Sequence, residues 1–252
     1  MKQYRYIFSA CDNGVRFGCG DAYALYGAFL ELVSAPLAER LHSQEHGGIA
    51  QYLVPFSNGK CASWYVSVLD NDILPEVETG FAKAEISSLR LHSLQLKPEK
   101  HLCFETNCLA DLLKIPGDDF DCPRFHLRFL SPTAFRSGGE YVFMPSVKHL
   151  LGSLSMKWGA AFPFSPVNDS DALEALERGT RITGYNLQSV YFPLKGRMIP
   201  AFTGSITLNA KLAAPLLQLL RGLLSFGSFS GVGIKTTLGM GGYHVKESLR
   251  DI

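Results

Sequence analysis

The sequence predicts an α+β fold made of two tandem ferredoxin-like domains, each a βαββαβ unit with an antiparallel sheet. Three observations predict it. Apolar residues alternate along short segments and recur at helical spacing along longer ones. The order strand, helix, strand, strand, helix, strand occurs twice along the chain. An acidic Pro-Gly-Asp-Asp run at residues 116–119 separates the two copies. We therefore place one domain at residues 1–120 and the other at residues 121–252.

The first copy begins with an aromatic-rich strand at residues 4–8. Residues 21–42 are apolar at helical spacing, but Pro36 interrupts them, with Ser34 as a plausible cap, so we expect two short helices or one kinked helix. Strands follow at residues 51–57 and 62–69, a helix at 74–84 and a strand at 86–96.

The second copy follows the linker at residues 115–123. Its expected strands are residues 125–130, 185–192, 201–208 and 243–245. Its expected helices are residues 146–158 and 212–224.

Composition excludes several classes of protein. With 252 residues and 46% hydrophobic content, the chain can bury a core in each domain. It has no signal-like N-terminus and no run of about 18 apolar residues, so we expect a cytoplasmic protein without a membrane partner. The six cysteines form no Cys-x-x-Cys pair and are expected to be reduced. A zinc site of His101, Cys103 and Cys108 is the alternative, but it lacks a second ligand pair, and we expect neither metal nor cofactor.

Charge is distributed unevenly, although the net charge is only +1. Residues 178–246 contain eight Lys or Arg and no acid, whereas residues 70–121 carry eleven of the 23 acids. This separation is typical of a protein with one face for a polyanion, but it equally fits a basic surface that faces only solvent.

A glycine pattern near the C-terminus is the most distinctive motif. It reads Gly231-Val232-Gly233, five residues, then Gly239-Met240-Gly241. A dinucleotide-binding fingerprint needs a third glycine where this chain has Thr236, and a phosphate-binding loop of nucleotide triphosphatases needs glycine directly before Lys235, where it has Ile234. The nucleophile elbow of a hydrolase needs serine where it has Phe229. All three motifs are therefore excluded. Glycines permit positive φ and close backbone approach, so amides could face phosphates beside Lys235. The plainer alternative is a tight connection between the last helix and the last strand, and a small anionic ligand is a further one.

This pattern resembles the signature of the CRISPR-associated repeat RNA endoribonucleases, the sixth family of CRISPR-associated proteins. Residues 130–135 and 145–158 resemble the strand end and helix that open the family's second domain, and residues 41–42 and 55–57 resemble the frame of its active site. The resemblance implies metal-independent cleavage of CRISPR repeat RNA within precursor guide RNA, with other CRISPR-associated proteins as further partners. Because the wider superfamily of repeat-associated RNA-binding proteins has members without catalysis, a non-catalytic RNA-binding subunit is the alternative.

The resemblance puts the catalytic histidine just after the first helical region, where His42 and His46 both lie. Histidine suits the proton transfers of RNA cleavage because its ordinary pKa lies near working pH. Counting forward from Pro36 favours His42, and counting back from Pro55 favours His46. The family's helix tyrosine has no clean match in Tyr23 or Tyr26.

Contacts to the RNA backbone are expected from the basic third of the chain. The residues predicted to bind RNA are Gly231, Gly233, Lys235, Gly239, Gly241, Lys195 and Arg197. Aromatic residues available for base stacking, if they face outward, are Tyr185, Tyr191 and Phe192.

Overall fold

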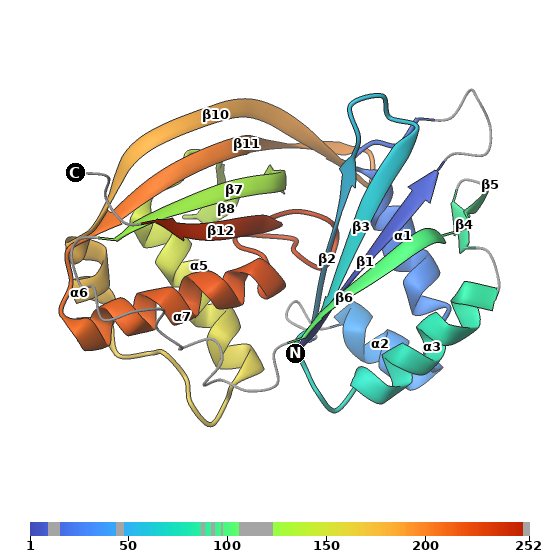
Figure 1. Cartoon of the computed structure of the whole chain (residues 1–252), viewed down its shortest axis with the longest axis horizontal. Helices are drawn as coiled ribbons and strands as arrows, with labels where there is room; N and C mark the ends of the chain where they lie inside the picture. Colours follow the sequence, from blue (N-terminus) through green and yellow to red (C-terminus); the bar gives the residue numbers. More distant parts are fainter. Residues whose placement is uncertain are drawn as a thin grey trace.

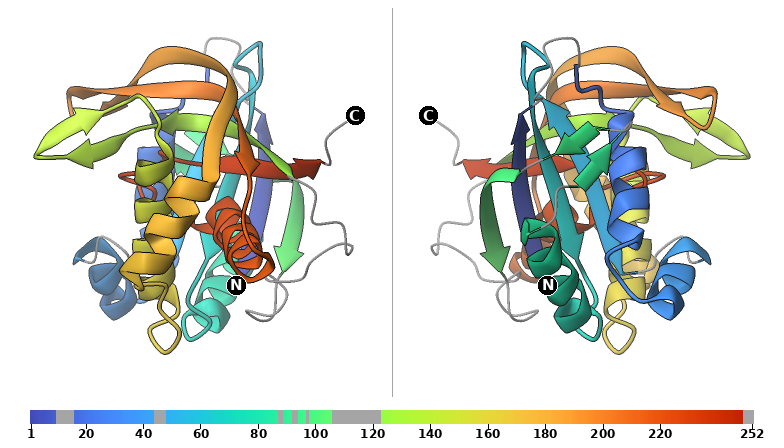
Figure 2. Two further views of the ribbon diagram at one scale, coloured as in Figure 1. Left: turned by 90° about the vertical axis from the view of Figure 1, so that its left-hand side faces the viewer. Right: turned by 90° about the vertical axis from the view of Figure 1, so that its right-hand side faces the viewer.

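The protein is α+β, with two four-stranded antiparallel sheets that each carry helices on one face (Figure 1). This computed structural model describes residues 1–9, 16–43, 48–86, 89–91, 94–96, 98–105 and 123–248. In Figure 1, α5 and α7 lie below the second sheet and α1 to α3 lie on the side of the first sheet that faces away from the second half, and Figure 2 gives two further views of this arrangement. The predicted combination of α+β class and antiparallel sheets is confirmed.

The first sheet has the strand order β2-β3-β1-β6. Its first strand thus lies between the third strand and the last one of this half. The elements of this half are β1 (Lys2–Ser9), α1 (Asp21–Leu30), α2 (Ala35–Ser43), β2 (Ile49–Pro55), β3 (Cys61–Val68), α3 (Leu74–Ile86), β4 (Leu89–Leu91), β5 (Leu94–Leu96) and β6 (Pro98–Glu105).

The second sheet has the strand order β10-β11-β7-β12, which places its first strand in the same way. A separate short hairpin, β8 and β9, follows β7 directly. The elements of this half are β7 (Arg124–Thr133), β8 (Phe135–Ser137), β9 (Glu140–Val142), α5 (Val147–Ala161), α6 (Ser170–Gly179), β10 (Thr180–Leu194), β11 (Arg197–Ala210), α7 (Ala214–Ser230) and β12 (Tyr243–Ser248).

Most expected elements are present, and the differences have physical reasons. Two short helices or one kinked helix were expected at residues 21–42, and the structure has two helices, α1 and α2. They are separate because the chain turns at Ser34 before Pro36. The strand expected at residues 86–96 is wrong as the sheet's last strand, since β4 and β5 pair only with each other and β6 pairs with β1. Helix α6 was not expected, although Asp169 caps its first turn by accepting from the amides of Asp171 and Ala172. The expected linker lies almost wholly outside the described residues.

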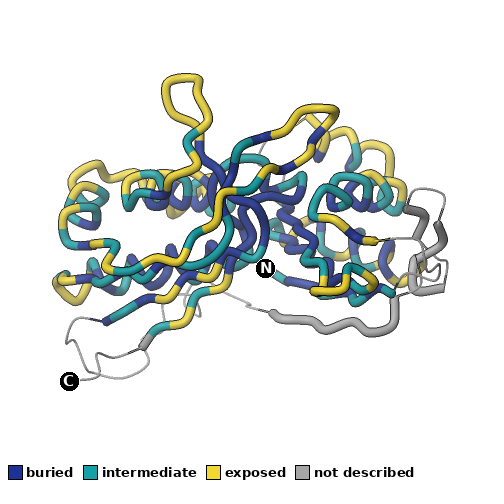
Figure 3. Tube along the Cα trace, turned by 90° about the horizontal axis from the view of Figure 1, so that it is seen from above, coloured by how far each residue is buried: buried dark blue, intermediate teal, exposed yellow. Residues whose placement is uncertain are grey.

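Three clusters of buried side chains form the core. One lies between the first sheet and α1 to α3, and a second lies between the second sheet and α5 to α7. The third joins the halves, because it combines Phe192 and Ile199 of the β10–β11 hairpin with Met240 and, at its edge, Cys19 and Tyr23 near the start of α1. The long β10–β11 hairpin reaches across to the first half (Figure 1), and the buried segments gather where the two halves meet (Figure 3). In the part of the chain that is described, no helix is long and apolar enough to cross a membrane.

Candidate functional site

The glycine pattern forms a loop between α7 and β12, as expected, and it is buried at the junction of the two halves. Gly231, Gly233, Gly239 and Gly241 all have positive φ, at 65°, 81°, 116° and 79°. At each of these four glycines an added Cβ would lie less than 3 Å from an atom of a neighbouring residue, so there is no room for a side chain. A Cβ at Gly239 would lie 2.5 Å from the Cβ of Ala22 in α1. Glycine is therefore required here for both backbone conformation and space.

The loop's amides are largely used within the protein. The amide of Val232 donates to the carbonyl of Gly241 at 2.9 Å, which closes the loop on itself. The amide of Gly233 donates to Ser153 Oγ at 2.8 Å, and that of Gly241 to the carbonyl of Pro132 at 3.0 Å. These bonds anchor the loop to α5 and to the end of β7.

Gln51 in β2 anchors the same loop to the first half. Its backbone amide donates to the carbonyl of Thr236 at 2.9 Å. Its side-chain nitrogen donates to the carbonyls of Ala22 and Thr237, both at 3.0 Å, while its oxygen accepts from Trp64 Nε1 at 2.9 Å. Because Gln51 is only 1% exposed, these bonds form a satisfied polar network inside the junction.

Two lysines flank this junction, and they are the only described residues other than glycine with positive φ. Lys195 has φ 50° in the two-residue turn between β10 and β11, and Lys235 has φ 56° in the glycine loop. Lys195 is exposed, and its Nζ lies 5.4 Å from the ring centroid of Tyr23 in α1. Arg197, which begins β11, is exposed beside it. The hairpin that bears Lys195 and Arg197 packs against the loop that bears Lys235, since Leu194 and Ile199 share a buried cluster with Ile234 and Met240.

His42 lies in the last turn of α2 and is exposed. The Tyr26 hydroxyl donates to the carbonyl of Leu41, the residue before it, at 3.0 Å, so this phenol fixes the end of the helix. Burial raises the pKa of Tyr26 to about 12, so the hydroxyl stays a hydrogen-bond donor even in mildly alkaline solution, which suits a positioning role. His46, the other candidate, lies outside the described residues.

The open faces of the two sheets meet at a second, basic patch. Tyr52 Oη lies 3.3 Å from Nε2 of His244 in β12, and the ring of His244 packs edge-on against Tyr65. The guanidinium of Arg5 lies 5.3 Å from the centre of the Tyr65 ring. Burial, followed by the charges of Arg5 and Arg128, lowers the pKa of His244. The imidazole is therefore held towards its neutral form in this contact.

The aromatic residues expected to stack on bases divide into two groups. Tyr185 and Tyr191 are 71% and 64% exposed along β10. Phe192 is fully buried in the cluster that joins the halves, so its expected availability for stacking is wrong. Alternation along a strand turns neighbouring side chains to opposite faces, which explains why Tyr191 and Phe192 differ.

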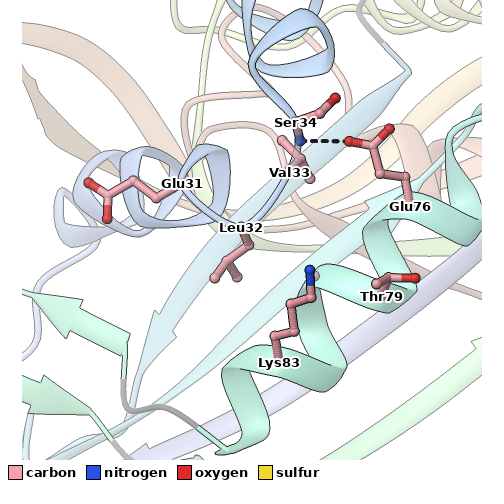
Figure 4. A pocket seen from close by; sticks show the side chains of 8 residues that line it. Glu31, Leu32, Val33, Ser34, Glu76, Thr79 and Lys83 are labelled. Carbon is pink, nitrogen blue, oxygen red and sulfur yellow. Dashed lines mark hydrogen bonds between the residues drawn. The ribbon is translucent and has the colours of Figure 1, made fainter.

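Metal ligands and one surface pocket were the remaining candidates for a site among the described residues. Among the described residues, no group of three or more His, Cys, Asp or Glu could hold a metal ion. Cys108 and the side chains of His101 and Cys103 lie outside that description. A surface pocket of about 420 Å³ lies between the α1–α2 connection and α3 (Figure 4). Because Glu31 and Glu76 line it beside Lys83, it does not suit a polyanion.

Known proteins resemble this chain along nearly its whole length. The family model of the CRISPR-associated endoribonuclease Cas6 matches residues 127–243. The CRISPR-associated endoribonuclease Cas6 of Streptococcus thermophilus is 32% identical over 249 residues, which cover 98% of this chain and 99% of that protein. The protein of the same name from Mycobacterium tuberculosis is 28% identical over 223 residues, covering 88% of this chain and 70% of its own.

A solved structure shares the same fold. A product complex of a Thermus thermophilus Cas6 matches with a TM-score of 0.81 and 23% identity, covering 97% of this chain and 99% of that one. At this identity the likeness concerns the arrangement of helices and strands and assigns no residue.

Proposed function

This chain belongs to the CRISPR-associated endoribonuclease Cas6 family, and from that premise we propose that it cleaves CRISPR repeat RNA to release guide RNAs from their precursor. The observation that carries the proposal is the packing of the β10–β11 hairpin, whose turn bears Lys195 and Arg197, against the glycine loop that bears Lys235. Three cations on two segments that pack together favour a phosphate backbone as the ligand.

The two halves are proposed to be tandem ferredoxin-like domains, residues 1–120 and 121–252. The support is that both sheets place their strands in the order second, third, first, last, with helices on one face. Because α7 packs on the other face of the first sheet, where Gln3 donates to the Ser228 carbonyl, the arrangement leaves the other face of the second sheet and the junction for RNA.

The proposed RNA contacts of the glycine loop come from its tip and from side chains. The amides of Gly231, Gly233 and Gly241 donate to protein acceptors, so these glycines would serve RNA binding through the loop's shape. Within the described residues, the amides of Lys235, Thr236 and Gly239 have no backbone or side-chain acceptor. Thr236 and Gly239 are buried, so the amide and the ammonium of the half-buried Lys235 are the groups left to face phosphate oxygens.

The proposed chemistry needs no metal. The ribose 2′-OH attacks the adjacent phosphorus, a base removes its proton, and an acid protonates the departing 5′ oxygen, giving a 2′,3′-cyclic phosphate and a 5′-OH. His42 or His46 would carry out one of these transfers, which is worth about 10²–10⁴ in rate. The exposure of His42 at the end of α2 supports it as a group that RNA can reach.

The experiment that tests this function incubates the CRISPR repeat RNA of the host genome with wild type, His42→Ala and His46→Ala in EDTA. We expect wild type to cut and one variant to lose about 10²–10⁴ in rate. Loss of wild-type cleavage in EDTA would refute the metal-independent mechanism. Tight binding without any cut product would favour a non-catalytic RNA-binding subunit.

A further inference from the structure

Lys157 is a buried cation that the proposed RNA contact does not include. It lies in α5 and is only 5% exposed. Its Nζ donates to Thr236 Oγ1 in the glycine loop at 2.8 Å. A long cationic side chain is rarely buried without a specific role, and here it ends on the loop.

Thr236 occupies the centre of the loop and is itself 6% exposed. Its methyl group lies 2.9 Å from where a Cβ would stand at both Gly231 and Gly241, so the two glycines close around it. Its carbonyl accepts from the Gln51 amide of the first half at 2.9 Å. Thr236 is therefore held from α5 on one side and from β2 on the other.

Lys235 directly precedes Thr236 in the loop. Its backbone is left-handed, and its carbonyl accepts from the amides of Leu238 and Met240 at 2.9 and 3.2 Å. A left-handed lysine persists only where its surroundings hold it. The peptide that follows Lys235 belongs to Thr236, so the bond from Lys157 fixes the conformation that presents the Lys235 side chain.

We propose that Lys157 is a positioning residue, which holds Thr236 so that Lys235 meets a phosphate of the bound RNA. The proposal rests on the proposed function, because that function supplies the phosphate. Lys157 acts through the loop and does not touch the RNA.

The test compares Lys157→Met, Thr236→Val, Thr236→Ser and Lys235→Ala by the affinity for the CRISPR repeat RNA at several salt concentrations. Losing one phosphate contact lowers the slope of log K against log salt by about 0.7 and the affinity about fivefold at 0.1 M salt. We expect this loss in Lys157→Met, Thr236→Val and Lys235→Ala, and wild-type behaviour in Thr236→Ser, which keeps the hydroxyl. The double variant Lys157→Met/Lys235→Ala should bind like Lys235→Ala alone.

A role limited to stability gives a different pattern. An unchanged salt slope in Lys157→Met, or a loss that multiplies with that of Lys235→Ala, would overturn the proposal. In Thr236→Val the buried Lys157 ammonium loses the Thr236 hydroxyl as an acceptor, and this variant can fail to fold. The double variant Lys157→Met/Thr236→Val, which removes the ammonium as well, then takes its place in the comparison.

Hydrogen exchange supplies a readout without RNA. In Lys157→Met the amides of Ile234 and Met240 should exchange about tenfold faster, the effect of losing one hydrogen bond, while that of Leu127 in β7 is unchanged. Equal exchange in wild type and variant would count against the proposal. Failure of the proposed function looks different, since wild type would then bind RNA with the expected slopes and yield no cleaved product.

Discussion

The side chain of Gln51 donates to the carbonyl of Thr237, 186 residues further along the chain, at 3.0 Å. The same side chain accepts from Trp64 within the first half. One amide group thus joins the core of the first half to the glycine loop of the second. The geometry of the candidate RNA site therefore depends on a residue in β2 that is fully buried.

Replacing Gln51 with Leu should destabilise the protein by about 2–4 kcal/mol, because Trp64 Nε1 and two carbonyls lose their partner in a buried site. Urea denaturation measures the free energy of unfolding. Gln188→Leu is the matched control, since Gln188 is exposed in β10 and its replacement should change stability by less than about 0.5 kcal/mol. Equal losses in the two variants would show that the network at Gln51 contributes nothing.

Glycines of the loop and of a surface turn should differ sharply when replaced by alanine. Gly239 and Gly196 both have positive φ, at 116° and 74°, but a Cβ at Gly196 meets no atom within 4 Å. Gly196→Ala should cost about 1–2 kcal/mol for the left-handed backbone alone. Gly239→Ala should cost about 1–3 kcal/mol more, because its Cβ must displace Ala22 and Phe192. Thermal unfolding of both variants measures the difference, and equal shifts would refute the crowding argument.

Sequence patterns predict the place of this loop well and its role less well. The Gly-apolar-Gly spacing is local, so it predicts positive φ and close approach without further knowledge. Which groups approach depends on Ala22, Phe192 and Gln51, which are far away in sequence. Gln51 looks like any polar residue in a strand, and only the packing of β2 against the loop reveals its three partners.

For the candidate catalytic residues, too, local patterns predict the position in the chain but not the contacts with distant residues. Helical spacing and Pro36 predict the helix end at which His42 lies. No spacing rule gave Tyr26 a role, because its bond to the Leu41 carbonyl follows from the packing of α1 on α2. The strand expected at residues 86–96 fails because alternation cannot tell a short separate hairpin from a strand of the main sheet.

His244 should make the stability of the junction depend on pH. Its pKa is lowered in the folded protein, mainly by burial, so the unfolded chain binds a proton more readily. Stability should therefore fall as the pH drops through the unfolded pKa of about 6.5, and the loss should level off below the folded pKa. Part of this residue is exposed, so the change is small.

The measurement compares wild type with His244→Gln by urea denaturation between pH 7.5 and pH 5. The difference cancels the titration of all other groups. Wild type should lose stability relative to the variant as the pH falls. A difference that stays constant, or that grows in favour of wild type, would contradict the lowered pKa.

Lys195→Asn should separate RNA binding from stability. Lys195 is left-handed in a two-residue turn before Gly196, a position where Asn is favoured. Relieving the left-handed lysine gains about 1 kcal/mol, while losing the contact with the Tyr23 ring costs about 0.5–1 kcal/mol. The free energy of unfolding should thus change by less than about 0.5 kcal/mol, because these two terms oppose each other.

The affinity for RNA should fall in the same variant if Lys195 contacts a phosphate, with the slope of log K against log salt reduced by about 0.7. Lys211→Ala is the matched control, because it removes the same charge just beyond the opposite end of β11. That control should leave the slope as in wild type. Equal slopes for Lys195→Asn and wild type would place the RNA elsewhere than the β10–β11 turn, since each phosphate contact that is lost lowers the number of counterions released on binding.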